Sequence, residues 1–391
     1  MSKTMIFLLD GTANDASEIN AETENFSNVY AINQLIADQK RESGKVIAQI
    51  TFYLPGIGTK FTVRRDTIAS KWLKLREYVF GDNLDQLVLR SYVNLVANYR
   101  PGDRLVLVGF SRGAAAARIF SRLISDFGVL RSEFLLHLDE IWRQFVAISD
   151  EENDKIYFDE ITKLKNSLSA KYNRNAFHET PIIKFMGLYD TVTGRHDRGV
   201  ASFLRFRDQV PASKVECIVH LLSMHENRKE FPLRRFELRD GVELREIWLP
   251  GVHADVGGGY KKNFLANIAL LTMAEFLSKL GNVSLNREAV NELCETLCED
   301  ISRKADFVVN TPAKISGDKT LRYVRAGDEI HPIHWRLVGQ TLRWKDHPGE
   351  TLYENRMPVD CNEQDNDLSR WFDRCFGLSF HRLTAGRRNA A

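Results

Sequence analysis

The sequence predicts an α/β fold with a mostly parallel sheet and helices on both of its faces. Short apolar runs of strand length recur along the chain, and segments with apolar residues at helical spacing lie between them. The composition, 43% hydrophobic and 27% charged, is typical of a globular protein. With 391 residues, the chain is long enough for one large domain with insertions or for two domains.

Five apolar segments are predicted to contain strands, because they have strand length or β-branched character and meet Gly, Pro or Asp where they stop. They are residues 3–10 (KTMIFLLD), 45–59 (KVIAQITFYLPGIGT), 104–110 (RLVLVGF), 181–190 (PIIKFMGLYD) and 244–251 (LREIWLPG). Residues 83–103 show apolar spacing of period 3.6 and stop at Pro101 and Gly102, which predicts a helix before the third strand.

Two regions depart from this alternation. Residues 121–180 are charged and helical over a length that exceeds a simple crossover, so we expect a helical insertion there that serves as a cap over the site. Residues 277–298 are again helical, and from about residue 317 the chain becomes irregular. We therefore expect a catalytic domain over residues 1–280 and an extension over residues 281–391 that packs on it.

Charge and cysteine content exclude several function classes. The net charge is +2 and the two signs are interspersed, which predicts no nucleic-acid binding. Of the five cysteines, Cys294 and Cys298 are four apart, but no second pair follows at ligand spacing. We expect free buried thiols in a reducing compartment, no metal site and no organic cofactor.

No segment is predicted to cross a membrane. The N-terminal apolar run meets Asp10 too early for a signal peptide, and residues 264–277 are too short to span a bilayer. We expect a cytoplasmic protein in the producing cell, with any membrane contact peripheral.

The stretch Gly109-Phe110-Ser111-Arg112-Gly113 lies between the strand 104–110 and a predicted helix that begins with four alanines. A serine at such a strand–turn–helix junction is typical of a nucleophile elbow. The helix N-terminus would direct the Arg112 N–H at an oxyanion. The alternative is a tight turn without chemistry, for which small residues would suffice.

A serine nucleophile needs a base and an orienting acid, and candidates follow in the order Ser, Asp, His. Asp190 ends the strand-like segment 181–190, and His253 follows the segment 244–251 in a glycine-rich loop. Both are expected at the carboxyl edge of the sheet, where open α/β folds bind ligands. Asp255 is an alternative acid, although we expect it to shape the loop beside His253. Each residue taken alone also fits a structural role.

Asp10 ends the first strand and is expected at the same edge. The backbone N–H groups of Gly11 and Thr12 would supply the second half of an oxyanion hole. Alternatively, Asp10 is a turn aspartate that bonds its own backbone.

Six motifs together resemble a family of α/β-hydrolases that includes the phospholipase effectors of bacterial type VI secretion. They are LLDGT, YLPGIGT, YRPGD, VGFSRGAAAAR, GLYDTV and PGVHADVGGGY, over about residues 5–260, with a weaker echo in GDEIHPIHWRL. The resemblance implies a serine esterase acting on glycerophospholipids and delivered into neighbouring cells. It supports Ser111, Asp190 and His253 in their roles.

This chain departs from the family in two respects. His225 stands where an aspartate usually precedes Glu226. In addition, an extra membrane-contact module carried by larger effectors has no clear equivalent. The expected partners are a phospholipid surface and a secretion adaptor or immunity protein.

Two segments, residues 60–80 and 200–208, combine basic and aromatic residues. They are candidates for contact with an anionic bilayer. Alternatively, their arginines are solvated and their aromatic residues belong to the core.

Alternative functions are an esterase or thioesterase for another acyl substrate, an inactive hydrolase-fold binding module, or a toxin retained in the cytosol.

Overall fold

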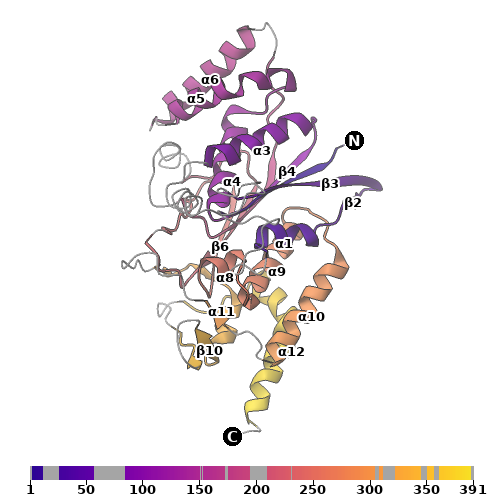
Figure 1. Cartoon of the computed structure of the whole chain (residues 1–391), viewed down its shortest axis with the longest axis vertical. Helices are drawn as coiled ribbons and strands as arrows, with labels where there is room; N and C mark the ends of the chain where they lie inside the picture. Colours follow the sequence, from indigo (N-terminus) through magenta and orange to yellow (C-terminus); the bar gives the residue numbers. More distant parts are fainter. Residues whose placement is uncertain are drawn as a thin grey trace, which may run out of the picture.

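The protein is built on a twisted sheet with helices on both faces (Figure 1). The computed structural model describes residues 2–11, 26–56, 84–149, 151, 153–171, 175–193, 209–229, 231–303, 308–310, 322–344, 350–355 and 361–388. The larger described sheet has eight strands in the order β2-β3-β1-β4-β5-β6-β7-β9, and every neighbouring pair is parallel except β2 with β3. This confirms the predicted fold class.

The strands β1, β4, β5 and β6 come from segments that are buried along nearly their whole length, as a sheet covered on both faces requires. In β1, alternate residues enter different cores: Met5, Phe7 and Leu9 face one, whereas Ile6 and Leu8 face the other. The strands are β1 (Thr4–Leu9), β2 (Gln39–Glu42), β3 (Lys45–Leu54), β4 (Arg104–Phe110), β5 (Ile183–Tyr189), β6 (Cys217–Ser223), β7 (Glu243–Leu249) and β9 (Glu329–Ile330).

One face of the sheet is covered by α3 (Leu84–Asn98) and α4 (Arg112–Arg122). The opposite face is covered by α1 (Asn28–Leu35), α9 (Phe264–Lys279) and, beyond them, α10 (Arg287–Arg303) and α12 (Asp367–Arg388). Figure 1 shows the two groups on either side of the strands.

The predicted helical insertion is a lobe whose two ends meet. Leu130 and Phe177 form a β-bridge, and the intervening chain holds a 3-10 turn (Ser132–His137), α5 (Leu138–Ile148) and α6 (Asp154–Lys171). The Trp142 indole donates to Asp85 of α3 at 3.4 Å. The described part of the lobe thus packs on α3 and on the π-helical turn after α4 (Leu123–Phe127).

The chain beyond residue 280 shares the core of the preceding part. β9 pairs with β7 in the main sheet, and α12 packs on α10 within the core that contains α9. A smaller described sheet has the order β11-β10-β8 and is formed by β8 (Val308–Val309), β10 (Thr341–Trp344) and β11 (Glu350–Leu352); α11 (Pro332–Leu337) precedes β10. The division at residue 280 stays a prediction.

Candidate active site

Ser111 occupies a strained turn between β4 and α4. Its φ of 57° and ψ of −126° lie in a region that non-glycine residues rarely adopt, and its N–H donates to Tyr189 O at 3.0 Å. That bond places the turn beside the end of β5. A strained serine at the sheet edge has the backbone conformation of a nucleophile elbow.

The two glycines around Ser111 are required by close backbone packing. A Cβ on Gly109 would lie 2.7 Å from Ala114 Cα, and one on Gly113 would lie 2.2 Å from Leu9 O. Four buried alanines, Ala114–Ala117, then continue the helix beside the strands. The small residues therefore let the elbow form, as the sequence predicts.

Asp190 lies at the end of β5 and is fully buried, with a φ of 42°. Its Oδ1 accepts from Ser223 N at 2.9 Å, and its Oδ2 accepts from Ser223 Oγ at 3.0 Å. Burial alone would raise the pKa of Asp190, but the charge of Arg322 and the contact with His253 hold it well below its ordinary value. Asp190 is therefore ionised at neutral pH.

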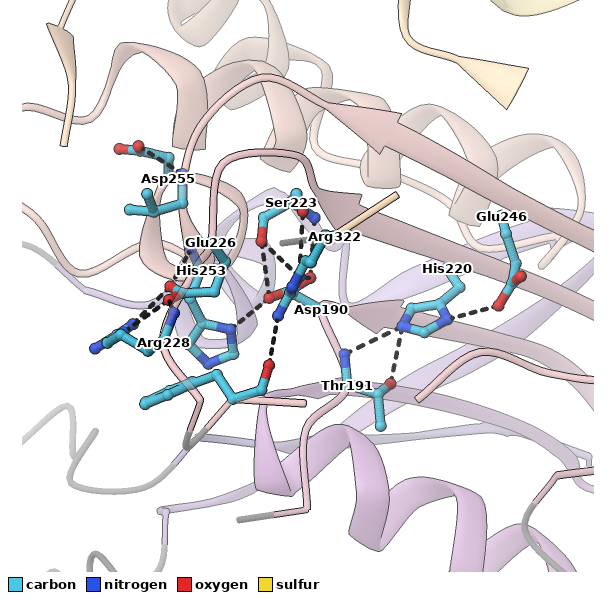
Figure 2. Close-up of polar contacts among 12 residues, drawn as sticks. Asp190, Thr191, His220, Ser223, Glu226, Arg228, Glu246, His253, Asp255 and Arg322 are labelled. Atoms are coloured by element: carbon cyan, nitrogen blue, oxygen red, sulfur yellow. Dashed lines mark hydrogen bonds and ion pairs between the residues drawn. The ribbon is translucent and has the colours of Figure 1, made fainter. Parts of the chain in front are cut away.

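His253 is the first residue of α8 (His253–Gly257), and its Nδ1 lies 2.6 Å from Asp190 Oδ2 (Figure 2). Because an ionised carboxylate only accepts, Nδ1 carries the proton and Nε2 carries the lone pair. The imidazole is packed between Phe110, at 4.6 Å between ring centroids, and Phe231, at 4.8 Å. Nε2 is buried without a hydrogen-bond partner among the described residues.

Burial lowers the pKa of His253, and this effect outweighs Asp190 and Glu226, which raise it; Arg228 lowers it further. The imidazole is therefore neutral at neutral pH, as a general base must be. No hydrogen bond between Ser111 and His253 is present in the described part of the chain. Phe110, which directly precedes Ser111, packs on the imidazole.

Glu226 and Arg228 hold the backbone of His253. Glu226 Oε2 accepts from His253 N at 3.2 Å, and Arg228 grips the same carboxylate through Nε and Nη2, both at 2.8 Å. His225 connects the same two loops, since its Nδ1 accepts from Gly251 N at 2.8 Å and its N–H donates to Gly251 O at 2.9 Å. His225 thus supplies a side-chain acceptor that links the loop after β6 to the loop before α8.

The amino-acid sequence also matches a known protein family. The sequence pattern described as "T6SS, Phospholipase effector Tle1-like, catalytic domain" matches residues 3–276. The chain belongs to this family. Its match ends within α9, so α10, α12 and the smaller sheet lie outside it.

Three proteins illustrate the likeness of this Tle1-like domain. The uncharacterized protein YEL023C of Saccharomyces cerevisiae is 27% identical over 237 residues, which cover 59% of this chain and 32% of that protein. The structure of the Tle1 effector bound to the VgrG spike of the type 6 secretion system is 20% identical and covers 66% of this chain and 51% of that one, with a TM-score of 0.35. An uncharacterized protein from Pseudomonas aeruginosa is 18% identical and covers 78% and 53%, with a TM-score of 0.40. The chain therefore spans about a third of the yeast relative and about half of each solved chain.

Asp10 lies at the sheet edge, as predicted, but its carboxylate serves a local network. It accepts from Gly11 N at 2.7 Å, Ser27 Oγ at 2.6 Å and Tyr53 OH at 2.8 Å. The Gly11 N–H is therefore engaged by Asp10 in this state. Thr12 lies outside the described residues, as do the two basic–aromatic segments 60–80 and 200–208.

Asp255 binds its own loop and a segment beyond residue 300. It accepts from Val252 N at 3.0 Å, Asn310 N at 3.0 Å and Asn310 Nδ2 at 2.5 Å, whereas Asp190 contacts the imidazole. Burial raises the pKa of Asp255 to about 7, despite these donors, which lower it. Asp255 thus ties α8 to the chain beyond residue 300.

The raised pKa of Asp255 predicts a pH-dependent stability. Between the unfolded value of 3.8 and the folded value of about 7, the folded state binds a proton that the unfolded chain has released. Raising the pH through this interval should lower the free energy of unfolding of the wild type by up to about 1.4 kcal/mol per pH unit, a slope absent from Asp255→Asn. Denaturant unfolding of both proteins at several pH values measures this; parallel curves would contradict it.

Two groups near the site escaped prediction from the sequence. His220 is buried in β6, where its Nε2 accepts from Thr191 N at 3.1 Å and its Nδ1 lies 3.1 Å from Glu246 Oε1. Arg322 reaches Asp190 from the irregular C-terminal region. A histidine inside the apolar run CIVHLLS was a usable signal for the first, whereas nothing in the sequence around Arg322 distinguishes it from other arginines.

Over the described ranges, no cluster of three His, Cys, Asp or Glu side chains has the arrangement of a metal site, and all five cysteines are free thiols. No helix in those ranges combines the length and the hydropathy that crossing a bilayer requires.

Proposed function

We propose that this chain is a serine hydrolase that cleaves acyl esters of glycerophospholipids, with Ser111 as nucleophile, His253 as base and Asp190 as the orienting acid. The observation that carries the proposal is the state of His253. Its Nδ1 is held by Asp190, and its buried Nε2 has no partner among the described residues. An acceptor nitrogen in that state can take a hydrogen bond and then a proton from a hydroxyl group, and Ser111 in the strained turn before α4 is the candidate donor.

The chemistry follows acyl transfer in two halves. Ser111 Oγ attacks the ester carbonyl carbon while its proton passes to His253 Nε2. The tetrahedral oxyanion then collapses, the bond to the glycerol oxygen breaks, and that oxygen takes the proton from Nε2. Water attacks the acyl-serine in the same way, which releases the fatty acid and restores Ser111.

The oxyanion would be stabilised at the N-terminus of α4. The helix begins at Arg112, and its first intrahelical bonds run from Ala114 N and Ala115 N to Ser111 O, at 3.1 and 3.2 Å. The Arg112 N–H follows the nucleophile directly, which is the position that supplies one oxyanion donor in hydrolases with an elbow. A contribution from the turn of Gly11 and Thr12 requires the Gly11 N–H to leave the Asp10 carboxylate or to share its proton with it.

The lipid substrate and the biological role rest on the family. A phospholipase effector acts at a membrane surface, so we propose peripheral contact with phospholipid, an antibacterial membrane-damaging role, and delivery through a secretion adaptor. An immunity protein in the producing cell would restrain such an activity.

The test is release of labelled fatty acid from phospholipid vesicles, with the label placed separately on each acyl chain. Wild type should release label and Ser111→Ala should not. Ser121→Ala is the matched control, because Ser121 is a buried serine of α4, the helix that follows Ser111, and its Oγ donates to Arg118 O at 2.6 Å. If Ser111→Ala releases as much labelled fatty acid as wild type, Ser111 is not the nucleophile. Cleavage of a short soluble ester without release from vesicles would keep the triad and reject the lipid.

A further inference from the structure

Arg322 brings the C-terminal extension into the candidate active site. It lies beyond residues 3–276, the span matched by the family, and its side chain is buried against the fully buried Asp190. Figure 2 shows Asp190 between His253 and Arg322. His253 Nδ1 contacts Asp190 Oδ2, and Arg322 Nη1 donates to Asp190 Oδ1, so both oxygens of the carboxylate are engaged.

The guanidinium group joins three separate segments. Nη1 donates to Asp190 Oδ1 at 2.5 Å, to Ser223 Oγ at 2.7 Å and to Ser223 O at 3.2 Å, and Nη2 donates to Phe231 O at 3.1 Å. Asp190 ends β5, Ser223 ends β6, and the ring of Phe231 packs on His253. Arg322 therefore contacts the candidate acid Asp190, the end of β6 at Ser223, and the backbone of Phe231, whose ring packs on His253.

We propose that Arg322 is a positioning residue of the hydrolase, which holds the Asp190 carboxylate in the orientation that His253 requires and makes the extension part of the active site. This inference rests on the proposed function for its role in catalysis. The geometry has a simple rationale: a carboxylate without solvent needs several donors, and each one restricts its rotation.

The charge of Arg322 has a second consequence for His253. Asp190 and Glu226 favour the imidazolium, whereas Arg228 disfavours it together with burial. Arg322 shares the Asp190 charge, so less of that charge is available to stabilise a protonated His253. From this ion pair we expect the charge of Arg322 to disfavour a protonated His253 and so to keep the base neutral toward lower pH.

Two substitutions separate charge from shape. Arg322→Gln removes the charge and retains N–H donors, whereas Arg322→Lys keeps the charge without the planar fork. Arg336→Gln is the matched control, because Arg336 also belongs to the extension and binds two carboxylates, Glu363 at 2.9 Å and Asp373 at 2.8 Å, outside the site.

The first readout is the pH profile of kcat/KM on a soluble ester. Arg322→Gln should move the acid limb up by about one pH unit, because the imidazolium loses a repelling neighbour. Arg322→Lys and Arg336→Gln should leave the limb within about 0.3 units of wild type. If Arg322→Gln lowers only the melting temperature and leaves the limb in place, Arg322 is a structural residue and the proposal fails.

The second readout does not need activity. NMR titration of ¹³C-labelled histidine in the Ser111→Ala background, with His253 assigned by His253→Gln, gives the pKa of His253 directly. Arg322→Gln should raise it by about one unit, and an unchanged value overturns the proposal. If Arg322→Gln does not fold, Arg322→Lys still tests the proposal. A His253 pKa like that of wild type together with a reduced kcat would support a positioning role for Arg322. An unaltered kcat would reject that role. If the wild-type protein hydrolyses no ester, the proposed function is rejected, and the NMR titration still tests the effect of Arg322 on the pKa of His253.

Discussion

Asp190→Asn should lower kcat for ester hydrolysis by about 10⁴-fold, the scale measured for the equivalent substitution in serine proteases. Asn is close to Asp in shape, but its amide would offer His253 Nδ1 a donor or a weaker acceptor. The imidazole would then favour the tautomer with the proton on Nε2, which cannot accept a proton from Ser111. Arg322 would also keep a buried charge without its carboxylate partner.

The assay is steady-state hydrolysis of a soluble ester, with folding checked by circular dichroism. Asp126→Asn is a matched control: Asp126 is a buried aspartate paired with Arg122 at 2.8 Å, in the turn after α4. It should lose stability and keep kcat. An Asp190→Asn enzyme that retains kcat within about tenfold would show that Asp190 is not the orienting acid.

Gly113→Ala should destabilise the protein by about 3 kcal/mol or more, although alanine is the better helix former. The added Cβ would lie 2.2 Å from Leu9 O and 2.4 Å from Asp10 O. Both are backbone atoms at the end of the central strand β1, so neither can rotate away. The elbow would have to move relative to the sheet, and Ser111 with it, which should also abolish activity.

Gly377→Ala provides the opposite case within α12. A Cβ there meets nothing closer than 3.6 Å, from the Asp373 side chain. This substitution should raise the free energy of unfolding by up to about 1 kcal/mol through helix propensity. Denaturant titration of the two variants beside wild type measures both effects. A Gly113→Ala protein as stable as wild type would mean that α4 and β1 are not packed this closely.

Local patterns predicted five of the eight described strands of the main sheet and the turn at Ser111, because each of these depends on neighbours in sequence. The apolar run before Ser111, its two glycines and the alanines after it lie within 14 residues, 104–117, and determine a strand, a turn and a closely packed helix. The order of Ser111, Asp190 and His253 was informative for a related reason. Parallel strands bring their carboxyl ends to one edge, so residues that follow such strands converge.

The remaining parts depend on contacts between distant segments. β9 is only two residues long and is a strand because it pairs with β7. The choice of Asp190 over Asp255 as the partner of His253 was decided by how α8 is oriented, with Asp255 bound to Asn310 instead. Neither contact leaves a periodic signal in the sequence.

The sequence by itself determined the α/β class, the elbow at Ser111 and the chain order of the three candidate residues, because strand formation and tight turns are governed by local sterics and apolar periodicity. Only the tertiary structure decided that Asp190 is shared by His253 and Arg322 and that His253 Nε2 is left without a partner. Arg322 is 132 residues from Asp190 in the chain, and a charge pair at that separation is selected by the folded packing that buries both partners.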